Sequence, residues 1–441
     1  MSLVRERTWL TASLAALAFA VGAPTLAQQQ TPGAAQPQNA QPPPGVQQQR
    51  RTGGGGGGGP PQTQPLGDGP WDFTTEQGRI HVTVVTKGLE RPWGMAFLPT
   101  GDMLVTERPG RLRIVRGRVL DPTPIAGMPK IRAVVIGGLQ DVALHPNFER
   151  NRLVYFSYSK PDEKDETLST LAVARGRFDG GAALTNVEDI FVAKDWYSSA
   201  MAGQNMRCCG QGPADASFGA RMAFGRDGLL YVASGDRNWG EKAQDPSSHL
   251  GKIIRIRDDG RVPRDNPFAG REGYLPEIYT LGHRNPTGLT VNPATGELWS
   301  TEFGPRGGDE LNRIEAGKNY GWILVTHGNH YNNEPVVRGA EGVPGMTDPA
   351  LYWAPSTNPG NIAFYTGDKL PGWRGSLLLA AMSRALVRIS FDSAGKPVAQ
   401  ERLLRDLGQR FRDVRQGPDG AVYLLTDETA GAMLEVESQS P

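Results

Sequence analysis

The sequence predicts an all-β fold, a six-bladed β-propeller preceded by a signal peptide and a disordered spacer. Three observations predict it. An apolar run, a tight turn and a second β-rich run recur six times between residues 94 and 427. The segments between these copies lack the periodicity of amphipathic helices. The first 70 residues contain no such repeat and divide into an apolar leader and a tract of Gln, Pro and Gly.

Residues 1–27 are predicted to be a signal peptide. Arg5 and Arg7 supply the positive start, an apolar stretch follows from Trp9, and Thr25-Leu26-Ala27 offers small residues at the cleavage point. The alternative is an uncleaved membrane anchor, but a bilayer span needs about 20 apolar residues and this stretch is shorter. We therefore expect a periplasmic or secreted protein with no stable membrane span after cleavage.

Residues 28–70 are predicted to be a disordered spacer. They are almost entirely Gln, Pro and Gly, with a run of seven glycines from Gly53. Such a segment cannot bury enough apolar surface to offset the entropy lost on ordering. The folded domain is therefore predicted to span residues 71–441.

The repeats within residues 71–441 each predict a β-hairpin, because Gly, Asp, Asn and Pro supply the dihedral angles of tight turns between β-rich runs. Six copies over about 370 residues leave about 60 residues each, enough for a four-stranded blade. Two packed β-sandwiches are the alternative, although a sandwich does not need self-similar copies. The copies are GMAFLPTGDMLVTE from Gly94, DVALHPNFERNRLVYFSYS from Asp141, RMAFGRDGLLYVASGD from Arg221, GLTVNPATGELWSTE from Gly288, IAFYTGDKLPGWRGSLLLAA from Ile362 and DVRQGPDGAVYLLTD from Asp413.

In a propeller the blade loops converge at the mouth of the channel, so ligand groups should come from several distant loops. Four connections are long enough to reach it: Trp196–Phe218, Asp236–Gly282, Glu302–Tyr320 and His327–Asn361.

Charge and motifs exclude several functions. A net charge of +1 gives no concentrated basic face for nucleic acid. The sequence has no GxSxG elbow, no phosphate-binding loop and no GxGxxG after a strand, so acyl transfer, nucleotide hydrolysis and Rossmann cofactors have no support.

The two cysteines, Cys208 and Cys209, are adjacent. They predict either a strained vicinal disulfide or two loop thiols, since neighbouring Cα atoms are only about 3.8 Å apart.

Four segments carry candidate chemistry. GHRNPTGL from Gly282 places Arg284 and Asn285 at a blade edge, and TEFGPRGGDELN from Thr301 combines glycines with three carboxylates, a composition suited to calcium. RFRD from Arg410 places two arginines on one face of a strand, and GLQDVALHP from Gly138 opens the second repeat. Ordinary alternatives remain for each: arginines beside carboxylates are most often ion pairs, and GGDE is most often a turn.

Together these segments, with GLERPWGMAFLPTGDMLVTE from Gly88, resemble the glucose/sorbosone dehydrogenases that use pyrroloquinoline quinone (PQQ). The resemblance covers about residues 83–437 and keeps the motifs in the family's order. It implies a six-bladed propeller whose quinone lies over the channel beside a calcium ion, with a small sugar as substrate and a periplasmic electron acceptor.

The resemblance also implies roles for individual residues. Arg284 matches the arginine that polarises the reactive quinone carbonyl, and Asn285 matches its neighbour at the cofactor. Gly304 and Pro305 match positions whose backbone carbonyls hold calcium. Arg410 and Arg412 match arginines that pair with the carboxylates of the quinone, as bidentate guanidinium groups do well.

The sequence departs from the family's pattern at four places. Ser217 stands where the family has its catalytic histidine, and an unassisted serine is not a base near neutral pH. Ile136 stands where GQGGL has glutamine, Phe303 where histidine is common, and Met382-Ser383-Arg384 where a lysine is usual. The cofactor contacts are thus predicted to be retained, with Ser217 lining the sugar side of an altered catalytic site.

Three explanations of this departure follow. Asp215 or Asp236 takes over as base, or the substrate needs less help from a base, or the propeller binds a ligand without oxidising it. The leading hypothesis is oxidation of an aldose to its lactone by PQQ with calcium. The alternatives are a non-catalytic propeller that binds carbohydrate or protein, and a calcium-dependent lactonase, which would need a cage of acidic side chains.

Overall fold

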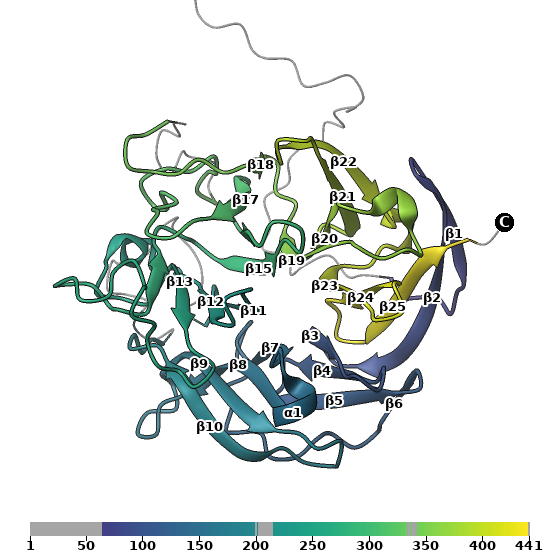
Figure 1. Ribbon diagram of the computed structural model, residues 1–441, viewed down its shortest axis with the longest axis horizontal. Helices are drawn as coiled ribbons and strands as arrows, with labels where there is room; N and C mark the ends of the chain where they lie inside the picture. Colours follow the sequence, from purple (N-terminus) through teal and green to yellow (C-terminus); the bar gives the residue numbers. More distant parts are fainter. Residues whose placement is uncertain are drawn as a thin grey trace, which may run out of the picture. The chain divides into compact units, whose positions relative to one another are not determined.

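The computed structural model describes residues 64–198, 201, 215–331, 333, 336 and 342–439. The predicted signal peptide, most of the predicted spacer and the Cys208-Cys209 pair lie outside these residues. The prediction of an all-β, six-bladed propeller is confirmed: six antiparallel sheets surround a central axis, with strands β3, β7, β11, β15, β19 and β23 innermost (Figure 1).

Each predicted repeat forms the two inner strands of one sheet. The first three sheets contain β3 (Pro92–Phe97), β4 (Met103–Glu107), β5 (Arg111–Arg116) and β6 (Val119–Leu120); β7 (Leu139–Leu144), β8 (Leu153–Pro161), β9 (Ser169–Arg177) and β10 (Thr185–Val192); and β11 (Gly219–Phe224), β12 (Leu230–Ser234), β13 (Lys252–Ile256) and β14 (Ile278–Thr280).

The next two sheets contain β15 (Pro286–Val291), β16 (Leu298–Glu302), β17 (Asp309–Ile314) and β18 (Leu351–Trp353); and β19 (Pro359–Phe364), β20 (Leu377–Ala381), β21 (Ala385–Phe391) and β22 (Pro397–Leu403). The helices of the described residues are short: α1 (Phe148–Asn151) and the 3₁₀ turns η3 (Gly240–Gln244), η4 (Pro371–Trp373) and η5 (Arg405–Leu407). None of these helices is long and apolar enough to cross a bilayer.

The last sheet joins the two ends of the described chain and closes the ring. It contains β23 (Phe411–Gln416), β24 (Val422–Thr426) and β25 (Gly431–Ser438) together with β2 (Gly78–Leu89) and β1 (Trp71–Thr75). β2 pairs with β25 in antiparallel register from Ile80 opposite Ser438 to Leu89 opposite Gly431. Closure of this kind leaves no open edge between the first and last blades.

The hydrophobic core lies between neighbouring blades. One cluster joins Leu104 and Ile114 of the first blade to Val142, Phe156 and Tyr158 of the second, all at most 1% exposed. The innermost strands β3, β7, β11, β15 and β23 share one burial pattern, four buried residues followed by two partly exposed ones. The repeated sequence pattern therefore corresponds to a repeated packing arrangement.

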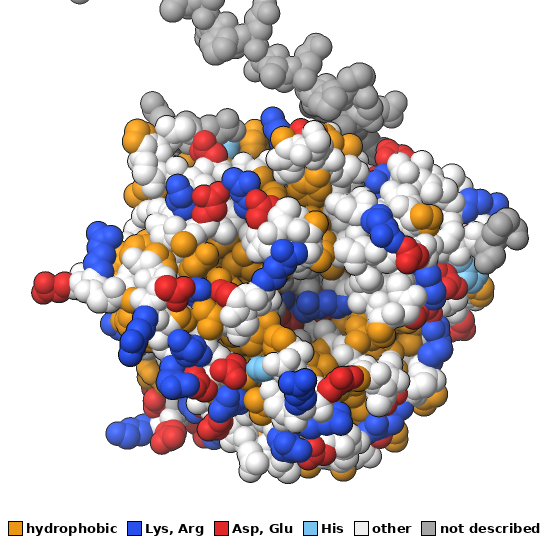
Figure 2. All heavy atoms as spheres, in the orientation of Figure 1, with side chains coloured by type: hydrophobic (Ala, Val, Ile, Leu, Met, Phe, Trp, Pro, Cys, Tyr) orange, Lys and Arg blue, Asp and Glu red, His pale blue; other side chains and the backbone are white. Residues whose placement is uncertain are grey.

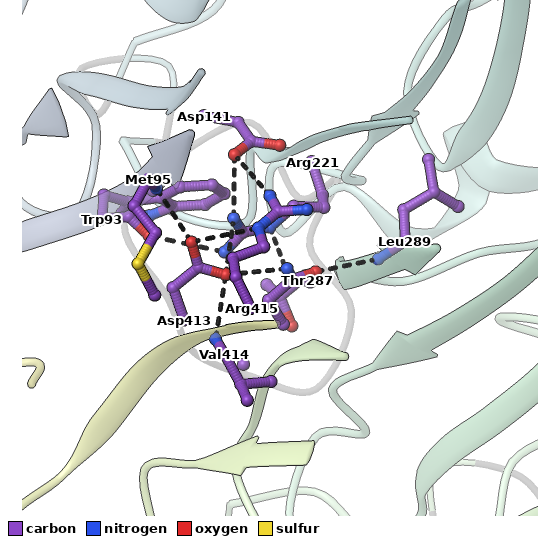
Figure 3. A network of polar contacts seen from close by, with 12 residues as sticks. Trp93, Met95, Asp141, Arg221, Thr287, Leu289, Asp413, Val414 and Arg415 are labelled. Atoms are coloured by element: carbon purple, nitrogen blue, oxygen red, sulfur yellow. Dashed lines mark hydrogen bonds and ion pairs between the residues drawn. The ribbon is translucent and has the colours of Figure 1, made fainter. Parts of the chain in front are cut away.

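Polar side chains from equivalent repeat positions meet at the axis (Figure 3). The guanidinium of Arg221 lies 2.9 Å from Asp141 Oδ1 and 3.4 Å from Asp413 Oδ1, with all three side chains fully buried. Asp141 also accepts a hydrogen bond from the backbone N–H of Met222 (2.8 Å), and Asp413 accepts one from Met95 (2.9 Å). These contacts link blades that are distant in sequence.

The face of the propeller that carries α1 has a central depression (Figure 2). Lys and Arg side chains lie in its floor, and acidic and basic side chains are mixed around it. The candidate site described next lies where the innermost strands begin, whereas α1 follows the end of β7, so the two occupy opposite ends of the channel.

Candidate active site

A cavity of 260 Å³ lies at the end of the channel where the innermost strands begin and the second strands end. Its lining brings together four residues singled out from the sequence, Arg284, Asn285, Arg410 and Arg412, with Ser217 beside them. The full lining is Trp93, Ile136, Gln140, Ala216, Ser217, Phe218, Gly219, Asn238, Arg284, Asn285, Thr287, Phe303, Tyr331, Met382, Arg410 and Arg412.

Arg284 is fixed at both its backbone and its side chain. Its backbone N–H donates to Glu302 Oε2 (2.6 Å), at the end of β16. Its guanidinium donates to the carbonyl oxygens of Gly304 (2.9 Å) and Phe303 (3.3 Å), and its Cζ lies 5.6 Å from the ring centroid of Trp322. The side chain is 6% exposed, so it is held in place with its charge largely desolvated.

A buried chain of hydrogen bonds holds the backbone of Arg284 in place. His283 is fully buried; one ring nitrogen contacts Thr280 Oγ1 (2.9 Å) and the other contacts Glu302 Oε1 (2.9 Å). Asn312 of β17 also donates to Glu302 Oε1 (2.9 Å). His283 is therefore a structural group that orients Glu302, which in turn fixes the backbone of Arg284.

Asn285 joins two blades at the cavity. Its Oδ1 accepts a hydrogen bond from the backbone N–H of Gly219 (3.0 Å), at the start of β11. The side chain is 7% exposed and lines the cavity. It therefore fixes the start of β11, the innermost strand of the third blade, beside Ser217.

Arg410 and Arg412 share one carboxylate. Arg410 donates to Asp427 Oδ2 (2.8 Å) and Arg412 donates to Asp427 Oδ1 (2.8 Å). Burial favours the neutral form of Asp427, but the charges of Arg412 and Arg410 outweigh it, and the pKa of Asp427 lies below its usual value. One carboxylate thus faces two guanidinium groups, which leaves positive charge at the cavity.

Arg108 adds to that positive charge from outside the lining. Burial, and then the charge of Arg412, lower the pKa of Arg108 to about 10. Arg108 is 8% exposed, and its buried Nε has no hydrogen-bond partner among the residues that the structure describes. Burial is the main cause of this lower pKa, but the charges of Arg412, Arg91 and Arg410 lower it further, while that of Asp427 opposes them. The arginines clustered here are thus only partly neutralised, and an anionic ligand would complement them.

Ser217 lines the cavity in a strained backbone conformation. Its φ is +52°, and its hydroxyl donates a long hydrogen bond to Asn238 Oδ1 (3.3 Å). An amide oxygen cannot take a proton from a hydroxyl at neutral pH, so this contact does not activate the serine.

The two carboxylates considered as replacement bases lie behind the cavity wall. Asp215 is 2% exposed beside Arg132 (3.4 Å), and Asp236 is fully buried, accepting hydrogen bonds from Trp322 Nε1 (2.8 Å) and the backbone N–H of Asn238 (2.8 Å). Burial raises the pKa of Asp236 to about 6 against the opposing effect of the Arg284 charge. Neither carboxylate is part of the cavity lining.

Gly304 and Pro305, the predicted calcium positions, line a neighbouring cavity of 740 Å³ that shares Phe303 and Tyr331 with the first. Gly304 must be glycine, because a Cβ there would lie 2.1 Å from the carbonyl oxygen of Gly307. Backbone carbonyls are suitable calcium ligands, but the oxygen of Gly304 already accepts a hydrogen bond from Arg284. Its second lone pair fits calcium, provided that an anion offsets the repulsion from the guanidinium.

The sequence analysis gave several lining residues no role, although Trp93 lies in the quoted run from Gly88 and Met382 stands where the family usually has a lysine. Trp93, Tyr331 and Met382 line the cavity from the first, fourth and fifth blades. Gln140, inside the quoted GLQD motif, also lines it, and its buried Oε1 has no hydrogen-bond partner within the described part of the chain. The position of Gln140 beside a repeat start was a usable signal, whereas Tyr331 lies in a long connection without any motif.

Known proteins resemble this chain over most of the predicted folded domain. The model of the glucose/sorbosone dehydrogenase family matches residues 89–435. Aldose sugar dehydrogenase YliI of Escherichia coli (strain K12) is 37% identical over 365 residues, covering 82% of this chain and 94% of the relative.

Solved structures give the same relationship. The apo form of the soluble aldose sugar dehydrogenase from Escherichia coli is 38% identical with a TM-score of 0.74, covering 82% of this chain and all of that chain. The PQQ-bound aldose sugar dehydrogenase from Streptomyces coelicolor is 27% identical with a TM-score of 0.64, covering 81% and 98%.

Proposed function

The chain belongs to the glucose/sorbosone dehydrogenase family, and we propose that it is an exported, PQQ-dependent oxidoreductase that converts an aldose-type sugar to its lactone. The charge of the cavity carries this proposal. Arg284, Arg410 and Arg412 line it, and no Asp or Glu belongs to its lining within the described residues. A tricarboxylate quinone complements such a site, because guanidinium groups bind carboxylates in bidentate pairs.

Each polar group then has a role toward the cofactor. Arg410 and Arg412 would hold carboxylates, Asn285 would contact the ring, and Arg284 would polarise the reactive carbonyl. The carbonyls of Gly304 and Pro305 would hold calcium beside it. When bound, the quinone would accept a hydride from the anomeric carbon of the sugar. Arg284 and calcium would both favour that step, since each stabilises negative charge developing on the same oxygen.

Among the described residues that line the cavity, none is a strong acceptor for the proton of the anomeric hydroxyl. Ser217 holds the sugar side but is no base at neutral pH, and a missing general base typically costs about 10²–10⁴-fold in rate. We therefore propose a slow dehydrogenase. It would work in the periplasm or outside the cell and pass electrons to a periplasmic acceptor, as the leader in residues 1–27 suggests.

A non-catalytic binding propeller is the second candidate, and Ser217 is the observation that favours it. A calcium-dependent lactonase has less support, because it would need acidic side chains converging on one ion. Among the described residues, no group of three or more His, Cys, Asp or Glu side chains is arranged to hold a metal.

Quinone-dependent dye reduction tests the proposal. The mature chain, with calcium and PQQ, would be assayed against a panel of aldoses while quinone binding is titrated in parallel. Arg284→Ala should abolish turnover. Arg261→Ala, which removes a surface arginine with a 77% exposed side chain, should leave it unchanged.

The outcomes separate the candidates. Turnover that is lost only in Arg284→Ala supports the dehydrogenase. Tight quinone binding without turnover favours the binding propeller. Absence of both binding and turnover would overturn the proposal.

A further inference from the structure

The second residues of four innermost strands form the floor of the cavity. They lie next to the buried axial network, which is built from the third residues of β7, β11 and β23 (Figure 3). The floor therefore combines an aromatic ring, a carboxamide, a hydroxyl and a guanidinium. These residues are Trp93 of β3, Gln140 of β7, Thr287 of β15 and Arg412 of β23.

Gln140 has an unused hydrogen-bond acceptor in this floor. The residue is 3% exposed, and its buried Oε1 has no partner among the described residues. The other polar groups of the floor are engaged: Thr287 Oγ1 donates to the carbonyl of Pro359 (2.8 Å), and Arg412 Nη2 donates to Asp427 (2.8 Å). Burying an acceptor without a partner costs free energy, so such groups are rare in folded proteins. A ligand that donates to Oε1 would remove this cost.

The backbone that carries this carboxamide is fixed from two sides. The hydroxyl of Thr106, in β4 of the first blade, donates to the backbone carbonyl of Gln140. The backbone N–H of Asp141 donates to Ser157 Oγ (3.0 Å), in β8 of the same blade as Gln140. Thr106, Asp141 and Ser157 are all fully buried. The strand is therefore positioned before a ligand binds, which lowers the cost of binding.

The arginines and amides elsewhere in the lining offer less to an N–H or O–H group of a ligand. A guanidinium group donates hydrogen bonds and does not accept them. Asn285 Oδ1 already accepts from the backbone N–H of Gly219 (3.0 Å), and Asn238 Oδ1 accepts from the hydroxyl of Ser217 (3.3 Å). Gln140 Oε1 is thus the amide oxygen of the lining that has both lone pairs available within the described residues.

We propose that Gln140 is a further ligand-binding residue, whose Oε1 accepts a hydrogen bond from an N–H or O–H group of the bound ligand. This inference rests on the proposed function, which supplies two sources of such a group: the pyrrole N–H of the quinone and the hydroxyls of the aldose. The carboxylates and carbonyls of the quinone only accept hydrogen bonds, so they complement the arginines and not this oxygen.

Gln140→Met tests the inference, because methionine has a similar shape and lacks the amide. Loss of an unpaired buried amide should leave the denaturant midpoint of the ligand-free chain unchanged or raise it. The affinity for the ligand that uses Oε1 should instead fall by about 2-fold to 10-fold, the effect of one neutral hydrogen bond. Calorimetric titration with calcium present measures the quinone. The aldose is measured by KM in dye reduction and, in a chain without turnover, by titration.

Gln416→Met is the matched control, at the other end of an innermost strand. Gln416 Oε1 accepts hydrogen bonds from the backbone N–H groups of Thr366 (2.7 Å) and Gly367 (3.0 Å). Gln416 lies outside the cavity lining. This variant should therefore lower the denaturant midpoint and leave the binding of both ligands unchanged.

Weaker quinone binding in Gln140→Met would assign the hydrogen bond to the quinone, and weaker sugar binding with unchanged quinone affinity would assign it to the sugar. Unchanged affinity for both ligands would overturn the inference and leave the proposed function standing. A midpoint that falls as it does in Gln416→Met would show that the carboxamide is structural, which also overturns the inference. A parent chain that neither binds quinone nor turns over any aldose would overturn the proposed function and this inference with it.

Discussion

Arg284 combines two properties that oppose each other. Its guanidinium is desolvated, yet it hydrogen-bonds to carbonyl oxygens rather than to a carboxylate, so its charge is only partly compensated. Binding of an anion nearby would relieve this imbalance. Arg410 and Arg412 are also incompletely neutralised, for a different reason: their two guanidinium groups share the single carboxylate of Asp427.

Ser217→His is expected to raise kcat by about 10²-fold, because it places a base with a pKa near neutrality at the sugar side. Histidine is among the residues that tolerate the positive φ found at this position. The measurement is kcat against pH, which should acquire an ionisation between about pH 6 and 7. Quinone titration of the variant is the control. Unchanged quinone affinity with no gain in kcat would show that proton removal does not limit the reaction.

Quinone affinity should depend on pH through Asp236, whose pKa is raised to about 6 by burial. Below pH 6 Asp236 is neutral and does not offset the charge of Arg284, so the cavity is more positive and binds an anionic quinone more tightly. Above pH 6 the ionised carboxylate weakens binding, by about threefold to tenfold for charges that interact through a partly screened interior. Titrations between pH 5 and 8 would measure this. Asp236→Asn should flatten the dependence, and a dependence retained in that variant would refute the assignment.

At the scale of elements, the connection between β16 and β17 would couple calcium to the quinone in the proposed function. Gly304, in this connection, offers one carbonyl oxygen to Arg284, and its backbone N–H donates to Asp309 Oδ1 (3.0 Å). Because the guanidinium repels a cation at that oxygen, calcium should bind well only when an anion is present as well. The two ligands should therefore show positive coupling, which must be reciprocal.

Removal of calcium with a chelator should weaken quinone binding by about 5-fold to 150-fold, which is the usual range of coupling between two sites. Calorimetric titration of quinone with and without calcium measures the effect. The reverse titration, of calcium with and without quinone, must give the same factor. Equal quinone affinity in both conditions would show that Gly304 and Pro305 hold no functional calcium.

The hairpins could be predicted from the sequence because their signals are local. Each repeat carries its own turn residues, and the predicted pairs correspond to β3–β4, β7–β8, β11–β12, β15–β16, β19–β20 and β23–β24. The pairing of β2 with β25 joins residues more than 340 positions apart, and no local pattern specifies it. The same reason explains the cavity: motifs placed Arg284 and Arg412 at strand entrances, but Trp93 and Tyr331 reach it only after the ring closes.

At the scale of the whole molecule, the axial network links blades through buried charges. Arg221 contacts Asp141 of the second blade and Asp413 of the sixth, and its guanidinium lies 4.0 Å from the ring centroid of Trp93, which lines the cavity. Burial lowers the pKa of Arg221, and the charges of Asp141 and Asp413 oppose that change. The network therefore connects the sixth blade, whose sheet closes the ring, with Trp93 in the cavity lining.

Arg221→Met is expected to destabilise the propeller by about 3–5 kcal/mol, because it leaves two buried carboxylates facing one remaining arginine, Arg415. The midpoint of denaturant unfolding measures this loss. Arg313→Met removes an arginine that is 48% exposed and paired with Glu297, and should cost only about 0–1 kcal/mol. Because a protonated carboxyl no longer needs the arginine, the deficit of Arg221→Met should shrink as pH falls toward 4. If instead the deficit is constant with pH, the loss comes from packing against Trp93 and not from the buried charges. Equal midpoints for Arg221→Met and the parent chain would show that the axial network does not hold the blades together.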